Sequence, residues 1–154
     1  DKKLEASNGK YLPHIYENTK VAEFDINGDG FIDLVEWIGP NDGLLIIYKE
    51  GKPVNGLSLF GEPGGWDHGY EKLIPYDVNK DKKLTGNELK EFSVWQDKNG
   101  NAKVDEDEVK SVAELGITDI SIEHTRMVSS FVQNGKTQTM WDWYPCVFDV
   151  KRTE

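Results

Sequence analysis

The sequence predicts an α+β fold in which short helices pack on β-hairpins. Three acidic segments of twelve residues lie at 25–36, 77–88 and 97–108. Apolar residues between Tyr70 and Leu115 have near-helical spacing, whereas the C-terminal third alternates apolar and polar residues. That third contains Asn134-Gly135, the dipeptide most typical of a two-residue hairpin turn.

Composition limits the classes of protein to which the chain can belong. At 154 residues and 37% hydrophobic it can bury a real core, and we predict an N-terminal segment 1–20 followed by one domain, 21–154. A net charge of −10 argues against a nucleic-acid partner. No apolar stretch approaches the ~20 residues of a membrane span. The sequence begins at Asp1, as expected of a mature form or a fragment, so the lack of a leader says nothing about compartment.

Three groups of elements are predicted along the domain. Residues 21–61 hold the first acidic segment and a β-hairpin formed by a strand at 44–48 and the run 57–60. Residues 70–116 hold the other two segments as a pair, joined by a shared helix of about two turns at 89–95. Residues 117–150 form a C-terminal β-hairpin region, with a strand at 117–123 and a hairpin of 127–133 with 136–143.

The segment 25–36 has the pattern of a calcium-binding loop. Calcium takes roughly 6–8 oxygen ligands, so a loop that wraps it presents oxygens at positions 1, 3, 5, 7, 9 and 12 and glycine at 6. Gly30 stands at position 6, and Phe31 at position 7 would offer its backbone carbonyl. The oxygen-bearing positions are Asp25, Asn27, Asp29, Phe31, Asp33 and Glu36. An Asp/Asn-rich surface turn explains the first half of this pattern but not Asp33 and Glu36.

The other two segments repeat the pattern without the glycine. Lys82 and Ala102 stand at position 6, where a left-handed backbone costs about 1–2 kcal/mol, or roughly tenfold in affinity. Leu84 and Val104 at position 8 are expected to form a short β bridge between the paired loops. The predicted ligands are Asp77, Asn79, Asp81, Lys83, Thr85 and Glu88 in one loop and Asp97, Asn99, Asn101, Lys103, Asp105 and Glu108 in the other, with each lysine contributing its backbone carbonyl. Two to three calcium ions are therefore expected, in EF-hand-like loops.

The segment 48–58 has the length of such a calcium-loop segment but lacks its acidic residues. Tyr48 and Lys52 stand where oxygen ligands would be needed. A lysine at such a position is incompatible with a cation site, so this element is expected to be structural only.

The runs Phe24–Gly30, Trp37–Leu45 and Val94–Gly100 resemble a calcium-loop module of large secreted bacterial proteins of the RTX and adhesin type. Leu59–Gly61 and Leu115–Ile117 belong to the same resemblance, which covers roughly residues 21–145. It implies a bacterial protein that is secreted, at the cell surface or periplasmic, whose repeated loops bind calcium and stabilise the fold. The loop at 48–58 departs from the family pattern, because it is not acidic.

One branch of that family is a self-processing module that cuts its own chain at an Asp-Pro bond. The six prolines follow Leu12, Gly39, Lys52, Glu62, Ile74 and Tyr144, and none follows an aspartate. Self-cleavage of this chain is therefore not expected, although the domain could be a relic of such a module.

Two other functions can be compared with the sequence. An enzyme is not expected: His68 beside Asp67 has no nucleophile nearby, and most carboxylates are taken by the loops. A dockerin-like module, in which calcium loops order a surface that binds a protein of the cell envelope, would expose apolar residues beside the loops. Phe92 and Trp95 are candidates for that surface and equally for the core. The sequence does not determine oligomeric state.

Overall fold

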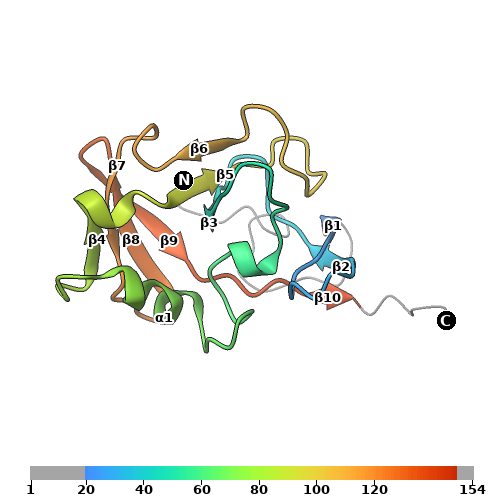
Figure 1. Ribbon diagram of the computed structural model, residues 1–154, viewed down its shortest axis with the longest axis horizontal. Helices are drawn as coiled ribbons and strands as arrows, with labels where there is room; N and C mark the ends of the chain where they lie inside the picture. Colours follow the sequence, from blue (N-terminus) through green and yellow to red (C-terminus); the bar gives the residue numbers. More distant parts are fainter. Residues whose placement is uncertain (1–19, 149–154) are drawn as a thin grey trace.

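A computed structural model describes residues 20–148 and shows a mostly β protein (Figure 1). Among these residues, three antiparallel sheets carry the architecture. The strands are β1 (Val21–Phe24), β2 (Asp33–Glu36), β3 (Leu44–Ile47), β4 (Lys83–Thr85), β5 (Phe92–Trp95), β6 (Val109–Ser111), β7 (Ile117–Ser121), β8 (Val128–Gln133), β9 (Lys136–Trp141) and β10 (Val147–Phe148).

Each sheet carries or adjoins one acidic loop. The first, in the order β1-β2-β10, is the hairpin around loop 25–36 with the C-terminal strand β10 added to it. The second has the order β3-β5-β6, and loop 97–108 joins its strands β5 and β6. The third has the order β4-β7-β8-β9, and loop 77–88 contains its edge strand β4.

The prediction of an α+β fold with helix-flanked loops is wrong. Within 20–148 the only α-helix is α1 (Gly69–Leu73), with three 3₁₀ turns: η2 (Gly56–Ser58), η3 (Ile74–Tyr76) and η4 (Gly86–Leu89). No helix in this part of the chain has the length or apolar character to cross a bilayer. The predicted helix at 89–95 is instead η4 followed by β5, because Phe92 and Trp95 are both fully buried in a central strand. Strand β6 likewise takes the place of the helical structure expected from residue 108 onward.

The expected pairing of loops 77–88 and 97–108 is also wrong. Leu84 in β4 pairs with Ile120 of β7, not with Val104. In Figure 1 the two loops lie toward opposite ends of the molecule, with loop 97–108 on the side of β1 and β2. Each loop therefore packs on its own sheet.

The strand predictions are confirmed in part. β3, β7 and the β8–β9 hairpin lie where they were expected, and Asn134 and Gly135 turn that hairpin with φ of 49° and 75°. The hairpin expected between 44–48 and 57–60 does not form, because β3 pairs with β5. Leu59 makes only an isolated bridge to Ile46.

Two apolar clusters hold the sheets together. The first contains Phe24, Trp37 and Trp95 and is bordered by loops 25–36 and 97–108, which contribute Ile26 and Ala102. The second lies under β4 and β7 and includes Leu84, Phe92 and Ile120. Since β5 supplies one aromatic residue to each cluster, it joins the two halves of the core.

Candidate metal centre

The three acidic loops share one backbone conformation in their first halves. Positions 4 and 6 have positive φ in every loop, at Gly28 and Gly30, at Lys80 and Lys82, and at Gly100 and Ala102. Left-handed backbone at position 6 matches the argument from sequence. Positive φ at position 4 was not predicted from the sequence, although the glycines Gly28 and Gly100 at that position indicate it.

The aspartate at position 1 organises this turn by accepting hydrogen bonds from the loop's amides. Asp25 accepts from the nitrogens of Gly28, Asp29 and Gly30 at 2.8, 3.1 and 3.0 Å. Asp77 accepts from residues 81 and 82 at 3.2 and 2.9 Å. Asp97 accepts from residues 100, 101 and 102 at 2.7, 3.3 and 2.8 Å.

Positions 3 and 5 continue the turn in the same way. Asn27, Asn79 and Asn99 each accept from the amide two residues on, at 3.0 Å. Asp29, Asp81 and Asn101 accept from the position 7 amides of Phe31, Lys83 and Lys103 at 2.8, 3.0 and 2.8 Å. The side chains at 1, 3 and 5 thus lie along the inside of a tight turn, as a cation site requires.

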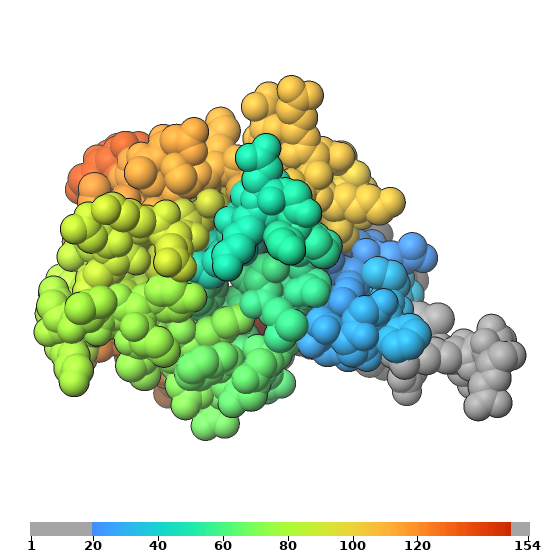
Figure 2. Space-filling model, in the orientation of Figure 1, coloured from blue at the N-terminus to red at the C-terminus, as the bar shows by residue number. Residues whose placement is uncertain are grey.

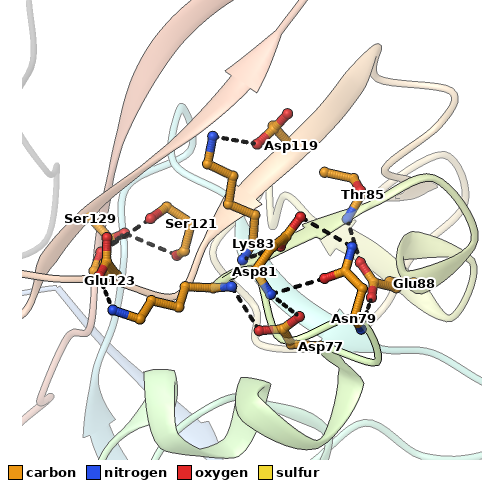
Figure 3. Close-up of polar contacts among 11 residues, drawn as sticks. Asp77, Asn79, Asp81, Lys83, Thr85, Glu88, Asp119, Ser121, Glu123 and Ser129 are labelled. Atoms are coloured by element: carbon orange, nitrogen blue, oxygen red, sulfur yellow. Dashed lines mark hydrogen bonds and ion pairs between the residues drawn. The ribbon is translucent and has the colours of Figure 1, made fainter.

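The position 12 glutamate closes two of the three loops. Glu88 accepts from the amide of Val78 at 2.8 Å. It also accepts from the amides of Asn79 at 3.3 Å and of Thr85, at position 9, at 3.0 Å (Figure 3). The Thr85 amide is the main reason that the pKa of Glu88 is lowered. The carboxylate therefore lies against the start of its own loop.

Glu108 occupies the same place in loop 97–108. It accepts from the amide of Lys98 at 2.9 Å and from that of Asp105 at 3.2 Å. Asp105 in turn accepts from the side-chain amides of Asn99 and Asn101, both at 2.7 Å, and these bonds lower its pKa. Positions 3, 5, 9 and 12 of this loop thus converge.

Loop 25–36 departs from the other two in its second half. Asp33 opens β2 opposite Phe24, so β2 runs away from the turn and Glu36 stands opposite Val21. That position is roughly 13 Å along the strand from Asp25, at ~3.3 Å per residue. The buried Glu36 carboxylate accepts instead from the Cys146 amide at 3.1 Å, next to β10. The structure does not bring Glu36 to the start of its loop.

Lys82 and Lys83 of loop 77–88 form ion pairs outside its turn. Lys82 forms an exposed ion pair with Glu123 at 2.7 Å, which raises the pKa of the lysine. Lys83 reaches Asp119 on β7 at 3.9 Å (Figure 3). Neither ammonium group competes with a cation inside the loop.

The donor sets of loops 77–88 and 97–108 fit a hard cation such as calcium. Both combine carboxylate, amide and backbone oxygens, and both are closed at position 12. No three His, Cys, Asp or Glu side chains gather into a metal-binding group anywhere in residues 20–148. A site in these loops would therefore depend on asparagine and main-chain oxygens as well.

The non-acidic segment 48–58 packs against loop 25–36. The Gly56 amide donates to the Asp25 carbonyl at 2.8 Å, and a Cβ on Gly56 would stand 1.6 Å from the Ile26 carbonyl oxygen. Figure 2 shows this teal segment against the blue residues of the first hairpin. The contacts are those of a structural element.

His68 has a structural contact in the fold. Its Nδ1 accepts from the Glu71 amide at 3.0 Å and so caps α1, and its ring lies against that of His124 with centroids 4.9 Å apart. Asp142, buried nearby, accepts from the Gly69 amide at 2.8 Å. Burial raises the pKa of Asp142.

Comparison with known proteins places these features in a family. The chain is 29% identical over 126 residues to the iron-regulated protein FrpA of Neisseria meningitidis serogroup C. The match covers 75% of this chain but only 11% of that protein. The family model for the SPM domain matches residues 12–142, which include all three acidic loops and the core strands β1 to β9. The chain therefore belongs to the SPM domain family.

Proposed function

We propose that this domain is a non-catalytic calcium-binding module in which loops 77–88 and 97–108 each hold one calcium ion and thereby stabilise the fold. Closure of both loops by Glu88 and Glu108 carries the proposal. A surface turn accounts for the bonds at positions 1 to 5, and a capping box at η4 accounts for the bond from Thr85 to Glu88. Neither accounts for the bonds that Glu88 and Glu108 accept from the amides of Val78 and Lys98 at the starts of their loops.

Calcium is preferred to magnesium on chemical grounds. Magnesium demands near-octahedral geometry and gives up its water reluctantly, whereas calcium accepts more ligands in a flexible arrangement. A twelve-residue loop with amide and main-chain oxygens suits the larger ion.

Loop 25–36 is proposed to bind more weakly than the other two. It keeps Asp25, Asn27 and Asp29 in the shared turn but sends Glu36 to the amide of Cys146. A site without the position 12 carboxylate loses up to two oxygens.

Native mass spectrometry and calorimetry of single-loop variants test the proposal. The wild type is expected to bind two calcium ions tightly, and Asp77→Asn and Asp97→Asn to lose one each. Asp25→Asn is the matched control, because it makes the same change at position 1 of the open loop. A wild-type mass that is identical with calcium and with chelator would overturn the proposal, and loss of an ion in Asp25→Asn would overturn the assignment.

The likeness to FrpA supports an exported bacterial setting for the module. The net charge of −10 suits surroundings rich in calcium, since two bound ions would reduce it to −6. Fractionation of the source bacterium, with recovery in the cytoplasm alone, would contradict this setting.

A calcium-dependent interaction module is the second candidate. Phe92 and Trp95 are fully buried and unavailable to a partner, but Phe31 and Ile32 on loop 25–36 are each 58% exposed. Capture of a cell-envelope protein that is lost in Phe31→Ser, with both calcium ions still bound, would favour this candidate.

A further inference from the structure

The indole of Trp37 joins the first sheet to loop 97–108. Trp37 directly follows β2, and its Nε1 donates to Asp97 Oδ2 at 2.6 Å. The two side chains are 2% and 1% exposed and sixty positions apart in sequence. Hydrogen bonds with one charged partner are stronger than neutral ones, and more so away from water.

Asp97 is held by an unusually complete set of donors. Its Oδ1 accepts from Gly100 and Asn101, and its Oδ2 from Ala102 and Trp37. Within residues 20–148, the side-chain ion pairs are those of Lys82 and Lys83, and Asp97 takes part in neither. The orientation of this buried carboxylate therefore rests on four N–H groups, of which one comes from another sheet.

Among the described residues, the equivalent aspartate of loop 77–88 has no support from another sheet. Asp77 is half-buried, and its bonds come from residues 81 and 82 of its own loop. The indole contact is thus a feature of loop 97–108 and not of the loop motif.

A second indole completes the link. Trp95 Nε1 donates to Glu108 Oε2 at 3.3 Å, so the carboxylates at both ends of loop 97–108 accept hydrogen bonds from tryptophan indoles. The rings of Trp37 and Trp95 meet edge to face with centroids 5.6 Å apart, and Phe24 of β1 lies 5.0 Å from Trp37. Hairpin β1–β2, strand β5 and loop 97–108 therefore share one buried aromatic cluster.

We propose that Trp37 is a positioning residue that couples calcium binding at loop 97–108 to the β1–β2 hairpin. This inference rests on the proposed function. By fixing Asp97 it prepares position 1 of the loop, and by linkage, occupancy of the loop stabilises the hairpin in return. Within residues 20–148, loop 77–88 has no contact of this kind, and it is expected to bind independently of the hairpin.

Trp37→Phe tests the coupling, because it removes the N–H and keeps an aromatic ring in the cluster. Calorimetry in an Asp77→Asn background isolates loop 97–108, and we expect its calcium affinity to fall about tenfold or more, as for one hydrogen bond to a charged group. Trp143→Phe is the matched control, since Trp143 packs on the same cluster. Equal losses in the two variants would show that packing alone matters and would overturn the proposal.

Hydrogen exchange supplies a readout that a packing role would not change. In the wild type, calcium is expected to slow exchange of the β1–β2 amides, and in Trp37→Phe that effect should disappear while loop 97–108 is still saturated. Calcium-dependent protection of the hairpin that persists in Trp37→Phe would overturn the proposal.

Two measurements keep the inference testable if Trp37→Phe fails to fold or if no calcium binds. In the folded wild type, the Trp37 indole N–H resonance should shift on calcium addition and stop shifting in Asp97→Asn; a resonance that never moves while the amides of loop 97–108 do would contradict the coupling. If the wild type binds no calcium, the proposed function fails. A double-mutant cycle of Trp37→Phe and Asp97→Asn in chelator then still measures the hydrogen bond between Trp37 and Asp97. Additive effects of the two substitutions on the free energy of unfolding would overturn the inferred role of that bond.

Discussion

At the residue scale, the acidic loops hold Lys80 and Lys82 in left-handed backbone, with φ of 60° and 68°. A side chain with a Cβ pays about 1–2 kcal/mol for that conformation. The strain is tolerated because the amides at these turns are tied to carboxylates, as Lys82 N is to Asp77.

Lys80→Gly is expected to raise the free energy of unfolding by about 0.5–1 kcal/mol, since relief of strain exceeds the extra chain entropy of glycine. Urea denaturation in chelator measures it. Lys90→Gly is the control, because Lys90 is also exposed but has a φ of −60°, so glycine should destabilise there. The same sign for both substitutions would contradict the assignment of strain.

Gly56→Ala is expected to destabilise the protein by about 2 kcal/mol or more, because the new Cβ would meet backbone at Ile26 that cannot move aside cheaply. Gly61→Ala is the comparison, since the nearest atom there is 3.7 Å away. Thermal unfolding of the two variants checks the difference, and equal melting temperatures would refute the close approach.

Asp142 has a raised pKa because burial disfavours its charged form, against smaller opposing effects of Gly69, Tyr144, His68 and His124. The folded state thus holds this proton to higher pH than the unfolded state, and stability falls as pH rises from the unfolded pKa through the folded one. Asp142→Asn should therefore be more stable than the wild type at pH 7 and lose that advantage below about pH 4. Denaturation at both pH values checks this, with the exposed Asp67→Asn as control. An advantage that does not depend on pH would contradict it.

At the element scale, strands replace helices around the loops because of which faces are buried. Loops 77–88 and 97–108 start only twenty residues apart, and the eight residues between them include Phe92 and Trp95, which enter different clusters. An extended strand reaches both clusters, as it spans about 3.3 Å per residue, against 1.5 Å for a helix.

The β8–β9 hairpin depends on its two-residue turn. Gly135 has a φ of 75°, and the Asn134 amide donates to the Gly116 carbonyl at 2.9 Å. Gly135→Ala is expected to cost about 1–2 kcal/mol, because alanine tolerates that φ poorly. Urea denaturation measures the loss, and an unchanged midpoint would argue against the turn geometry.

At the scale of the whole molecule, two loops at opposite ends pack on different halves of the core. If each site is loaded at about 100 times its dissociation constant, calcium adds about 2.7 kcal/mol per site. For a domain of this size, 1 kcal/mol shifts the melting temperature by roughly 2–4 °C.

Calcium is therefore expected to raise the melting temperature by about 10–20 °C over chelator, and magnesium by much less. Scanning calorimetry checks both ions in the wild type, and the double variant Asp77→Asn/Asp97→Asn should show no such rise. Equal stabilisation by magnesium would contradict the preference for calcium.

Local sequence patterns account for the loop turns and for the strands with strong local signals. Residues 25–31, 77–83 and 97–103 form the expected turn because each aspartate binds amides within five positions of itself. The Asn134-Gly135 hairpin is local in the same sense. These features depend on near neighbours, which a sequence displays directly.

Which loops close, and which residues support them, depends on contacts between segments far apart in sequence. Glu36 and Glu88 occupy the same position of one motif, yet Glu36 is drawn to the Cys146 amide, 110 positions away, when β10 joins β2. Trp37 reaches Asp97 because two sheets share one aromatic cluster. Both outcomes follow from how sheets pack, which joins residues far apart in sequence and leaves no periodic trace along the chain.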